Sequence, residues 1–271
     1  MTTLSTLESR YRAVMDRVAQ AAERSGRTAS DIFVVAVTKY AEIEDIRELI
    51  KLGHEDFGEN RVQQLIQRAG VIEEMLSRHR TMKGVAAERR TLLARDEGAE
   101  STTTLPEHVR WHMIGHLQRN KVSKVAPLVR LIHSVDSLRL VEELQGYAVK
   151  RDMDIDVLVQ VNVSEEESKF GCAVAAAPHL CDQIDATGNL HIRGLMTIAE
   201  QSENPEDARI CFSRCAEIFE DIERRGIGDG RFNILSMGMS GDFEVAIECG
   251  ANVVRVGSAI FGVRELSEDE A

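Results

Sequence analysis

Apolar residues near the start of the chain recur at helical spacing. They lie three or four positions apart between polar residues: Leu4, Leu7, Tyr11, Val14 and Val18. This spacing places them on one face of a helix, so it predicts an amphipathic helix, and Gly26 is a suitable residue to end it.

After this helix the pattern alternates strand and helix. The β-branched run "IFVVAVT" at 32–38 is typical of a buried strand, and "EIEDIRELIKLG" at 42–53 has helical spacing closed by a glycine. The same order repeats along the chain, with further strands predicted at "HEDFGE", "RWHMIG", "LIHSVD", "IDVLVQVNV", "IRGLMTI", "NILSMGMS" and "NVVRVGSAIFG". The pattern therefore predicts eight strands separated by helices.

Strands separated by helices form parallel sheets, and eight such units are typical of a closed (β/α)8 barrel. We therefore predict an α/β fold, a TIM barrel with one extra N-terminal helix, built as a single domain over 1–271. An open doubly wound sheet is the alternative. No glycine-rich G-x-G-x-x-G motif follows an early strand, which weighs against that alternative.

One segment, 77–107, departs from this alternation. Its first half is basic, its second half is rich in Gly, Ser and Thr, and Pro106 follows. We expect an extended or disordered insertion here, with at most a short helix at about 85–95. Its basic residues could bind a partner, but such charged runs are more often simply solvated.

Composition limits the classes of function. The chain has 271 residues, of which 43% are hydrophobic, enough for a substantial core. Its formal net charge of −12 gives no positive field that would attract nucleic acid or an anionic membrane. No apolar stretch reaches the roughly 20 residues of a membrane span, and the first residues do not resemble a signal peptide. An odd count of five cysteines argues against a disulfide framework. We therefore expect a cytoplasmic protein.

Lys39 directly follows the first predicted strand, in "DIFVVAVTKY". In a parallel barrel the residues that follow the strands share one face, so Lys39 should meet other polar residues in this position, such as Asn60. A lysine held among apolar side chains loses part of its charge and can attack an aldehyde to form a Schiff base. Pairing with a carboxylate is the alternative for one isolated lysine.

The loops after the last two strands read "SMGMSGD" (236–242) and "RVGSAIFG" (255–262). In TIM barrels these loops commonly bind phosphate, and both loops here combine serine hydroxyls with glycines that let the backbone approach an anion. Either loop alone could be an ordinary turn. Together they predict a phosphate site opposite Lys39. An aldehyde-reactive amine with a phosphate site points to pyridoxal 5'-phosphate (PLP).

Motifs along nearly the whole chain, apart from the insertion, resemble those of the pyridoxal phosphate homeostasis proteins, also described as proline synthetase co-transcribed homologues. They occur in the same order: "AVTKY", "FGENRVQQ", "WHMIGHLQRNK", "SVDS", "VNVSEEESKFG", "IRGLMTI", "LSMGMSGDFEVAIECG" and "VRVGSAIFG". That family resembles the barrel domain of alanine racemase, fold type III among PLP proteins. The resemblance implies that Lys39 carries the cofactor.

The cofactor-binding residues expected from this reasoning are Lys39, Asn60, Ser236, Ser240, Arg255, Gly257 and Ser258. By resemblance the serines and Gly257 surround the phosphate, and Arg255 lies beside the pyridine nitrogen. An arginine stays protonated, so it opposes protonation of that nitrogen and leaves PLP a poorer electron sink. Pairing of Arg255 with Glu248 or Asp242 is the alternative. We assign no metal ligand and no catalytic residue.

Some positions depart from the family pattern. His116 stands where proline is more usual, and Tyr40 with Ala41 replaces a more usual basic or proline-containing stretch. The role of His116 is therefore open. His112 and His116 are spaced like a zinc pair on a helix, but a strand ending at Gly115 does not keep that geometry.

Two classes of function fit these expectations. The one we favour is a non-enzymatic carrier that holds PLP as a Schiff base, passes it to apo-enzymes and takes part in PLP homeostasis. The other is an amino-acid racemase or decarboxylase. Racemases of this fold need a tyrosine from an extra β-domain, for which the chain after Gly262 leaves no room, and loss of that domain also favours a monomer. A phosphosugar aldolase fits less well, since its lysine usually lies on a later strand and the purified protein would be colourless.

Overall fold

The structure is a computed structural model that describes residues 6–93, 105–166 and 169–262. Its strands are β1 Phe33–Val37, β2 Asp56–Glu59, β3 Arg110–Met113, β4 Leu131–Val135, β5 Ile155–Asn162, β6 Cys172–Ala173, β7 Leu190–Met196, β8 Ile234–Ser236 and β9 Val253–Val256. Its helices are α1 Leu7–Arg24, α2 Ile43–Lys51, α3 Val62–Leu93, α4 Val122–Val125, α5 Leu138–Arg151, α6 Ala177–Asp185, α7 Arg209–Glu223, α8 Phe243–Glu248 and α9 Ser258–Phe261. None of these described helices is both long and apolar enough to cross a bilayer.

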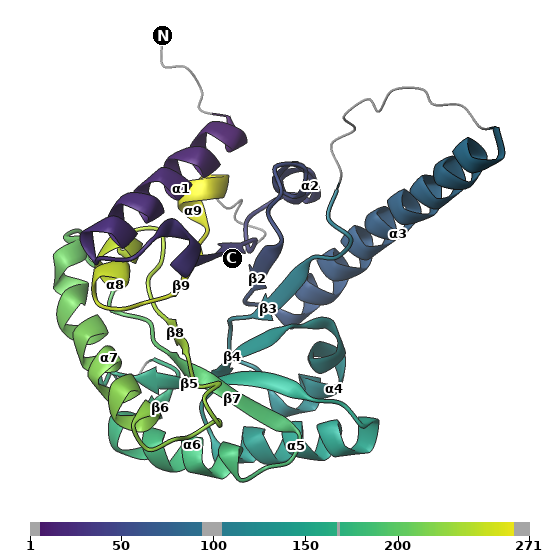
Figure 1. The fold of residues 1–271 in the computed structure, drawn as a ribbon. Coiled ribbons are helices and arrows are strands. Elements are labelled where there is room, and N and C mark those ends of the chain that lie inside the picture. Colours follow the sequence, from purple (N-terminus) through teal and green to yellow (C-terminus); the bar gives the residue numbers. More distant parts are fainter. Residues whose placement is uncertain (1–5, 94–104, 167–168, 263–271) are drawn as a thin grey trace, which may run out of the picture.

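Eight parallel strands of the described chain close into a barrel (Figure 1). They follow the order β1-β2-β3-β4-β5-β7-β8-β9, and β9 returns to pair with β1. Ala36 of β1 faces Phe57 of β2 on one side and Val256 of β9 on the other. The short strand β6 pairs only with β5 and stands outside this circle. The predicted TIM barrel is therefore confirmed, and the open sheet is excluded.

The main hydrophobic core lies between the barrel strands and the surrounding helices. In α2, for example, the buried side chains are Ile46, Leu49 and Ile50, which share one face of the helix. They join fully buried residues of the strands, such as Phe57, in one continuous cluster. The alternation of apolar runs in the sequence therefore corresponds to strands that are covered on their outer face by helices.

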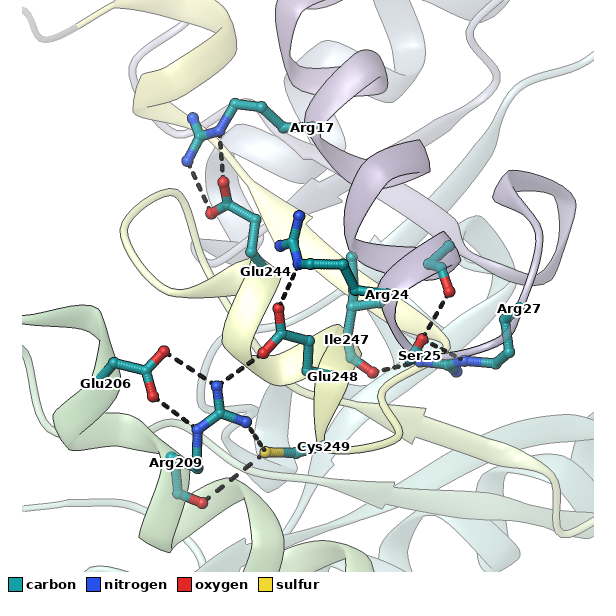
Figure 2. Close-up of polar contacts among 11 residues, drawn as sticks. Arg17, Arg24, Ser25, Arg27, Glu206, Arg209, Glu244, Ile247, Glu248 and Cys249 are labelled. Carbon is teal, nitrogen blue, oxygen red and sulfur yellow. Dashed lines mark hydrogen bonds and ion pairs between the residues drawn. The ribbon is translucent and has the colours of Figure 1, made fainter.

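Helix α1 precedes the βα repeats and packs against α8. Its apolar face is buried, and ion pairs join Arg17 to Glu244 and Arg24 to Glu248 (Figure 2). Glu248 also pairs with Arg209 of α7. Because these charged side chains are partly exposed, the pairs contribute little energy individually. The buried apolar face is therefore what fixes the extra helix to the barrel.

Helix α3 is longer than the sequence reasoning expected. It runs to Leu93, through the first half of the segment 77–107 that was expected to be extended or disordered. Strong helix formers such as Ala, Arg, Glu, Leu and Met fill this stretch, which explains the continuation. Figure 1 shows the distal part of α3 extending away from the barrel. The second half of the predicted insertion, 94–104, lies outside the described residues.

Candidate functional site

The loops after β8 and β9 meet beside the end of β1. Ser240 Oγ accepts hydrogen bonds from the backbone N–H groups of Gly257 (3.1 Å) and Ala259 (3.2 Å). Gly257 packs on β1, since a Cβ added to it would lie 3.2 Å from the Val37 carbonyl oxygen. The sequence reasoning placed these loops opposite Lys39. That placement is wrong, because β9 pairs directly with β1 and brings the loops next to the lysine.

The turn after β8 requires a glycine. Gly238 has a φ of 88°, and a Cβ there would lie 2.6 Å from the Ala246 Cβ and 2.8 Å from the Phe243 Cα. Its carbonyl accepts a hydrogen bond of 3.0 Å from the Arg255 N–H. Because any side chain would clash with α8, only glycine lets this turn lie close enough to α8 and β9 to present Ser240.

Lys39 lies in the turn between β1 and α2 and is exposed. Its ammonium nitrogen is 4.5 Å from the centroid of the Tyr40 ring, within cation–π distance. The expectation that Lys39 would be held among apolar side chains is therefore wrong. The strand β1 ends at Val37, and the fully buried residue after it is Thr38, so the lysine already lies beyond the core.

Arg68 of α3 bonds to the backbone of the turn that contains Lys39. Its guanidinium donates to the carbonyl oxygens of Thr38 and Ala41 and pairs with Glu59 of β2. The Thr38 hydroxyl also donates to the Glu59 carboxylate, which is fully buried. Burial raises the pKa of Glu59 above its ordinary value, and Arg68 opposes this rise. The sequence reasoning missed Arg68 and Glu59, because no short motif or spacing links them.

Asn60 follows β2 and carries an unsatisfied polar atom. Its side-chain oxygen is buried and has no hydrogen-bond partner among the described residues. The neighbouring loop after β3 packs tightly on it, since a Cβ on Gly115 would lie 2.1 Å from the Asn60 carbonyl oxygen. Leaving a buried acceptor unpaired costs free energy, so Asn60 is suited to accept a hydrogen bond from a ligand.

Arg255 of β9 is buried in the barrel, with 3% of its surface exposed. It donates to Ser236 Oγ at 2.6 Å and to the Thr197 carbonyl at 2.9 Å. The alternative pairing with Glu248 is wrong, because that carboxylate binds two other arginines near the surface. Burial lowers the pKa of Arg255 to about 10, and the charge of Asp242 opposes this shift. The guanidinium therefore stays cationic at neutral pH.

The residues expected around the phosphate separate into two groups. Ser240 and Gly257 bond to each other in the loops beside β1, and Ser258 is exposed at the start of α9. Ser236 is instead fully buried and bonds to Arg255 inside the barrel. Ser236 therefore contacts the arginine, whereas Ser240 contacts the backbone of the loop after β9.

The two histidines spaced like a zinc pair lie in different places. His116 is at the rim, where its ring stacks on Phe170 at 4.3 Å and its Nδ1 is 3.4 Å from an Asp136 oxygen. His112 lies inside the barrel and bonds to His133. In the part of the chain that the structure describes, no cluster of three or more His, Cys, Asp or Glu side chains is suited to a metal ion.

The chain matches a known family model and curated proteins along most of its length. The model for the alanine racemase N-terminal domain matches residues 10–265. A protein of Aquifex aeolicus named pyridoxal phosphate homeostasis protein is 35% identical over 260 residues, covering 94% of this chain and 97% of the relative. The protein of the same name from Escherichia coli K12 is 32% identical over 256 residues, covering 94% and 95%.

Solved structures agree with this similarity. A crystal structure described as an unknown protein from Bifidobacterium adolescentis has a TM-score of 0.79 and 36% identity, with 94% of each chain covered. PipY of Synechococcus elongatus, solved with PLP bound, has a TM-score of 0.68 and 27% identity, covering 92% of this chain and all of PipY. Alanine racemase of Corynebacterium glutamicum shares the fold, with a TM-score of 0.60 at 10% identity.

Proposed function

Because the chain belongs to the family of pyridoxal phosphate homeostasis proteins, which have the alanine racemase N-terminal domain fold, we propose that it binds PLP on Lys39 and takes part in PLP homeostasis as a carrier. Relatives that match over nearly their full length carry that name, and PipY was solved with PLP bound. The proposed recipients are apo-enzymes that need PLP. A cytoplasmic, monomeric protein remains part of the same proposal.

The position of the lysine beside the two glycine-containing loops carries this proposal. The aldehyde and the phosphate arm of PLP are attached to neighbouring carbons of its ring. A lysine that reacts with the aldehyde must therefore lie close to the group that binds the phosphate. Gly257 packs on Val37, two residues before Lys39, and its N–H bonds to Ser240. The closeness of this loop to the end of β1 therefore supports Lys39 as the amine and the Gly257 loop as the phosphate site.

The other residues would bind the remaining parts of the cofactor. Ser240 and the start of α9, with Gly257 and Ser258, would contact the phosphate, and Asn60 has a free acceptor. Arg255 would face the ring nitrogen, which lies across the ring from the aldehyde carbon. PLP supplies an electrophilic aldehyde and an electron-withdrawing ring when it is bound. A cationic arginine discourages protonation of the nitrogen and so weakens that withdrawal.

Carrier and enzyme can be separated by following the α-hydrogen of amino acids. With Arg255 cationic, the loaded protein is expected to exchange that hydrogen for solvent deuterium only very slowly. It should still deliver PLP to an apo-enzyme, measured as recovered activity of that enzyme. Racemisation or decarboxylation of any amino acid at an ordinary enzymatic turnover, on the order of 1 per second or faster, would instead support the enzyme alternative.

Ser240→Ala tests the phosphate loops. The change removes a hydroxyl that organises the Gly257 and Ala259 N–H groups, so PLP retention should weaken by about 1–3 kcal/mol, as for loss of a charge-assisted partner. Retention is measured by equilibrium dialysis, with pyridoxal, which lacks the phosphate, as the control ligand. Pyridoxal binding should barely change. Equal affinity of the parent protein for pyridoxal and PLP would rule out a phosphate site.

A further inference from the structure

A continuous chain of hydrogen bonds crosses the interior of the barrel. An Asp56 oxygen lies 3.1 Å from His112 Nε2, and the Nδ1 of that ring lies 2.9 Å from His133 Nε2. His133 Nδ1 lies 3.0 Å from Ser236 Oγ, which accepts a bond of 2.6 Å from Arg255. The exposed fraction falls from 16% for the Asp56 side chain to 0% for His133 and Ser236.

This polar chain joins the two ends of the barrel. Asp56 begins β2 at the amino-terminal end, whereas Ser236 is the last residue of β8. Since β4 and β8 are not neighbours in the barrel, the bond between His133 and Ser236 must pass through the interior. TIM barrel interiors are mostly filled by branched apolar side chains. Five linked polar residues are therefore an unusual core, stable only if each hydrogen-bonding group is satisfied.

The hydrogen-bond chain starts at the ionised carboxylate of Asp56. Burial alone would raise the pKa of Asp56, but hydrogen bonds from Arg110 and His112 outweigh it and hold the pKa below its ordinary value. An ionised carboxylate can only accept hydrogen bonds. The proton between Asp56 and His112 therefore sits on His112 Nε2.

The proton on His112 Nε2 determines where the other protons of the hydrogen-bond chain lie. In a neutral His112, Nδ1 accepts from His133 Nε2, and His133 Nδ1 then accepts from the Ser236 hydroxyl. Burial holds the pKa of His133 well below its ordinary value, and the charge of Arg255 adds to this shift, so this ring is neutral. In the reverse direction His133 and Arg255 would both donate to Ser236. The Ser236 hydrogen would then find no acceptor among the described residues.

We propose that Asp56, His112 and His133 are positioning residues that hold Arg255 in one orientation at the cofactor site. Since Ser236 donates its own hydrogen to His133, its lone pair is left for Arg255. Aligned hydrogen bonds polarise one another, so the Asp56 charge makes the Ser236 oxygen a stronger acceptor. That Arg255 meets the ring nitrogen of PLP rests on the proposed function. The direction of the hydrogen bonds from Ser236 to Asp56 does not depend on it.

The direction can be measured without the cofactor. In protein labelled with 15N-histidine, NMR correlation through the ring protons reports which nitrogen is protonated. In the parent protein each of the two rings should carry its proton on Nε2 and accept at Nδ1, with signals assigned from His112→Gln and His133→Gln. In Asp56→Asn the amide can donate as well as accept, so both rings should become mixtures of the two tautomers. A proton on Nδ1, or a doubly protonated ring, at either position in the parent protein would overturn the proposal.

A matched pair of variants tests the effect on the cofactor. Glu55 and Asp56 each pair with Arg110 at 2.7 Å, but only Asp56 contacts His112. Asp56→Asn should weaken PLP retention about three- to tenfold, the factor for loss of one ordinary hydrogen bond, while Glu55→Gln should match the parent. Equal PLP retention in the two variants would mean that the hydrogen-bond chain has only a structural role, and it would overturn the proposal. If the parent protein itself retains no PLP, the proposed function fails. The histidine tautomers measured by NMR then still test the direction of the hydrogen bonds.

Discussion

Lys39→Ala is expected to abolish the visible absorption band of the PLP-loaded protein and its sensitivity to borohydride. Lys39 is exposed in the turn after β1, beside the loop that contains Gly257, so its amine is accessible to an aldehyde whose phosphate lies in that loop. No other amine is proposed to form the Schiff base. The variant should therefore retain PLP only by noncovalent contacts, which absorbance after gel filtration will detect.

Two other lysines serve as controls for that assignment. Lys121 precedes α4, and Lys169 pairs with Glu166 in the loop after β5. Replacement of either by alanine should leave the band unchanged. Mass spectrometry of borohydride-reduced parent protein should find the adduct on the peptide that contains Lys39. An adduct on Lys121 or Lys169 would show that the assignment is wrong.

Arg68→Ala should lower the free energy of unfolding by about 3–5 kcal/mol, the range for removing one partner of a buried ion pair. The Arg68 side chain is only 12% exposed, and its removal leaves the buried Glu59 carboxylate without its cation. The carbonyl oxygens of Thr38 and Ala41 lose their donor as well. Chemical denaturation followed by far-ultraviolet circular dichroism measures the change.

A second arginine on the same helix provides the control. Arg78 pairs with Glu74, and both side chains are more than 60% exposed, so Arg78→Ala should change stability by no more than about 0.5 kcal/mol. Adding Glu59→Gln to Arg68→Ala should recover part of the loss, because it removes the unpaired charge. Similar small losses in the two arginine variants would mean that the buried pair does not hold the turn.

Local pattern was sufficient to predict the order of the secondary structure. The run at 32–38 became β1, the helical spacing before Gly26 became α1, and eight alternating units became the barrel. Burial of one face of each element depends on spacing within that element, so it can be read along the chain. The error at α3 has the same local origin. Polarity was taken to indicate a loop, although the residues before Leu93 have high helix propensity.

The sequence also predicted that Lys39 and the two loops containing glycine and serine lie at one end of the barrel, since residues after parallel strands share a face. Their relative positions depended on which strands pair. Barrel closure joins β9 to β1, which puts the loop at Gly257 beside the lysine instead of opposite it. Closure is a contact between the first and last strands of the barrel, so the positions of these loops follow from the pairing of distant strands and not from the pattern within one element.

The partners of single side chains were decided only by the tertiary structure. Sequence resemblance grouped Ser236 with Ser240, and the structure shows which partners each has: Ser236 bonds to Arg255 and His133 inside the barrel. A strand residue points to the interior or the exterior according to its register, and its partner comes from a strand across the barrel. The sequence by itself therefore determined the elements, the fold class and the set of candidate residues. The packing of distant strands determined which of those residues touch, because those contacts join positions far apart in the chain.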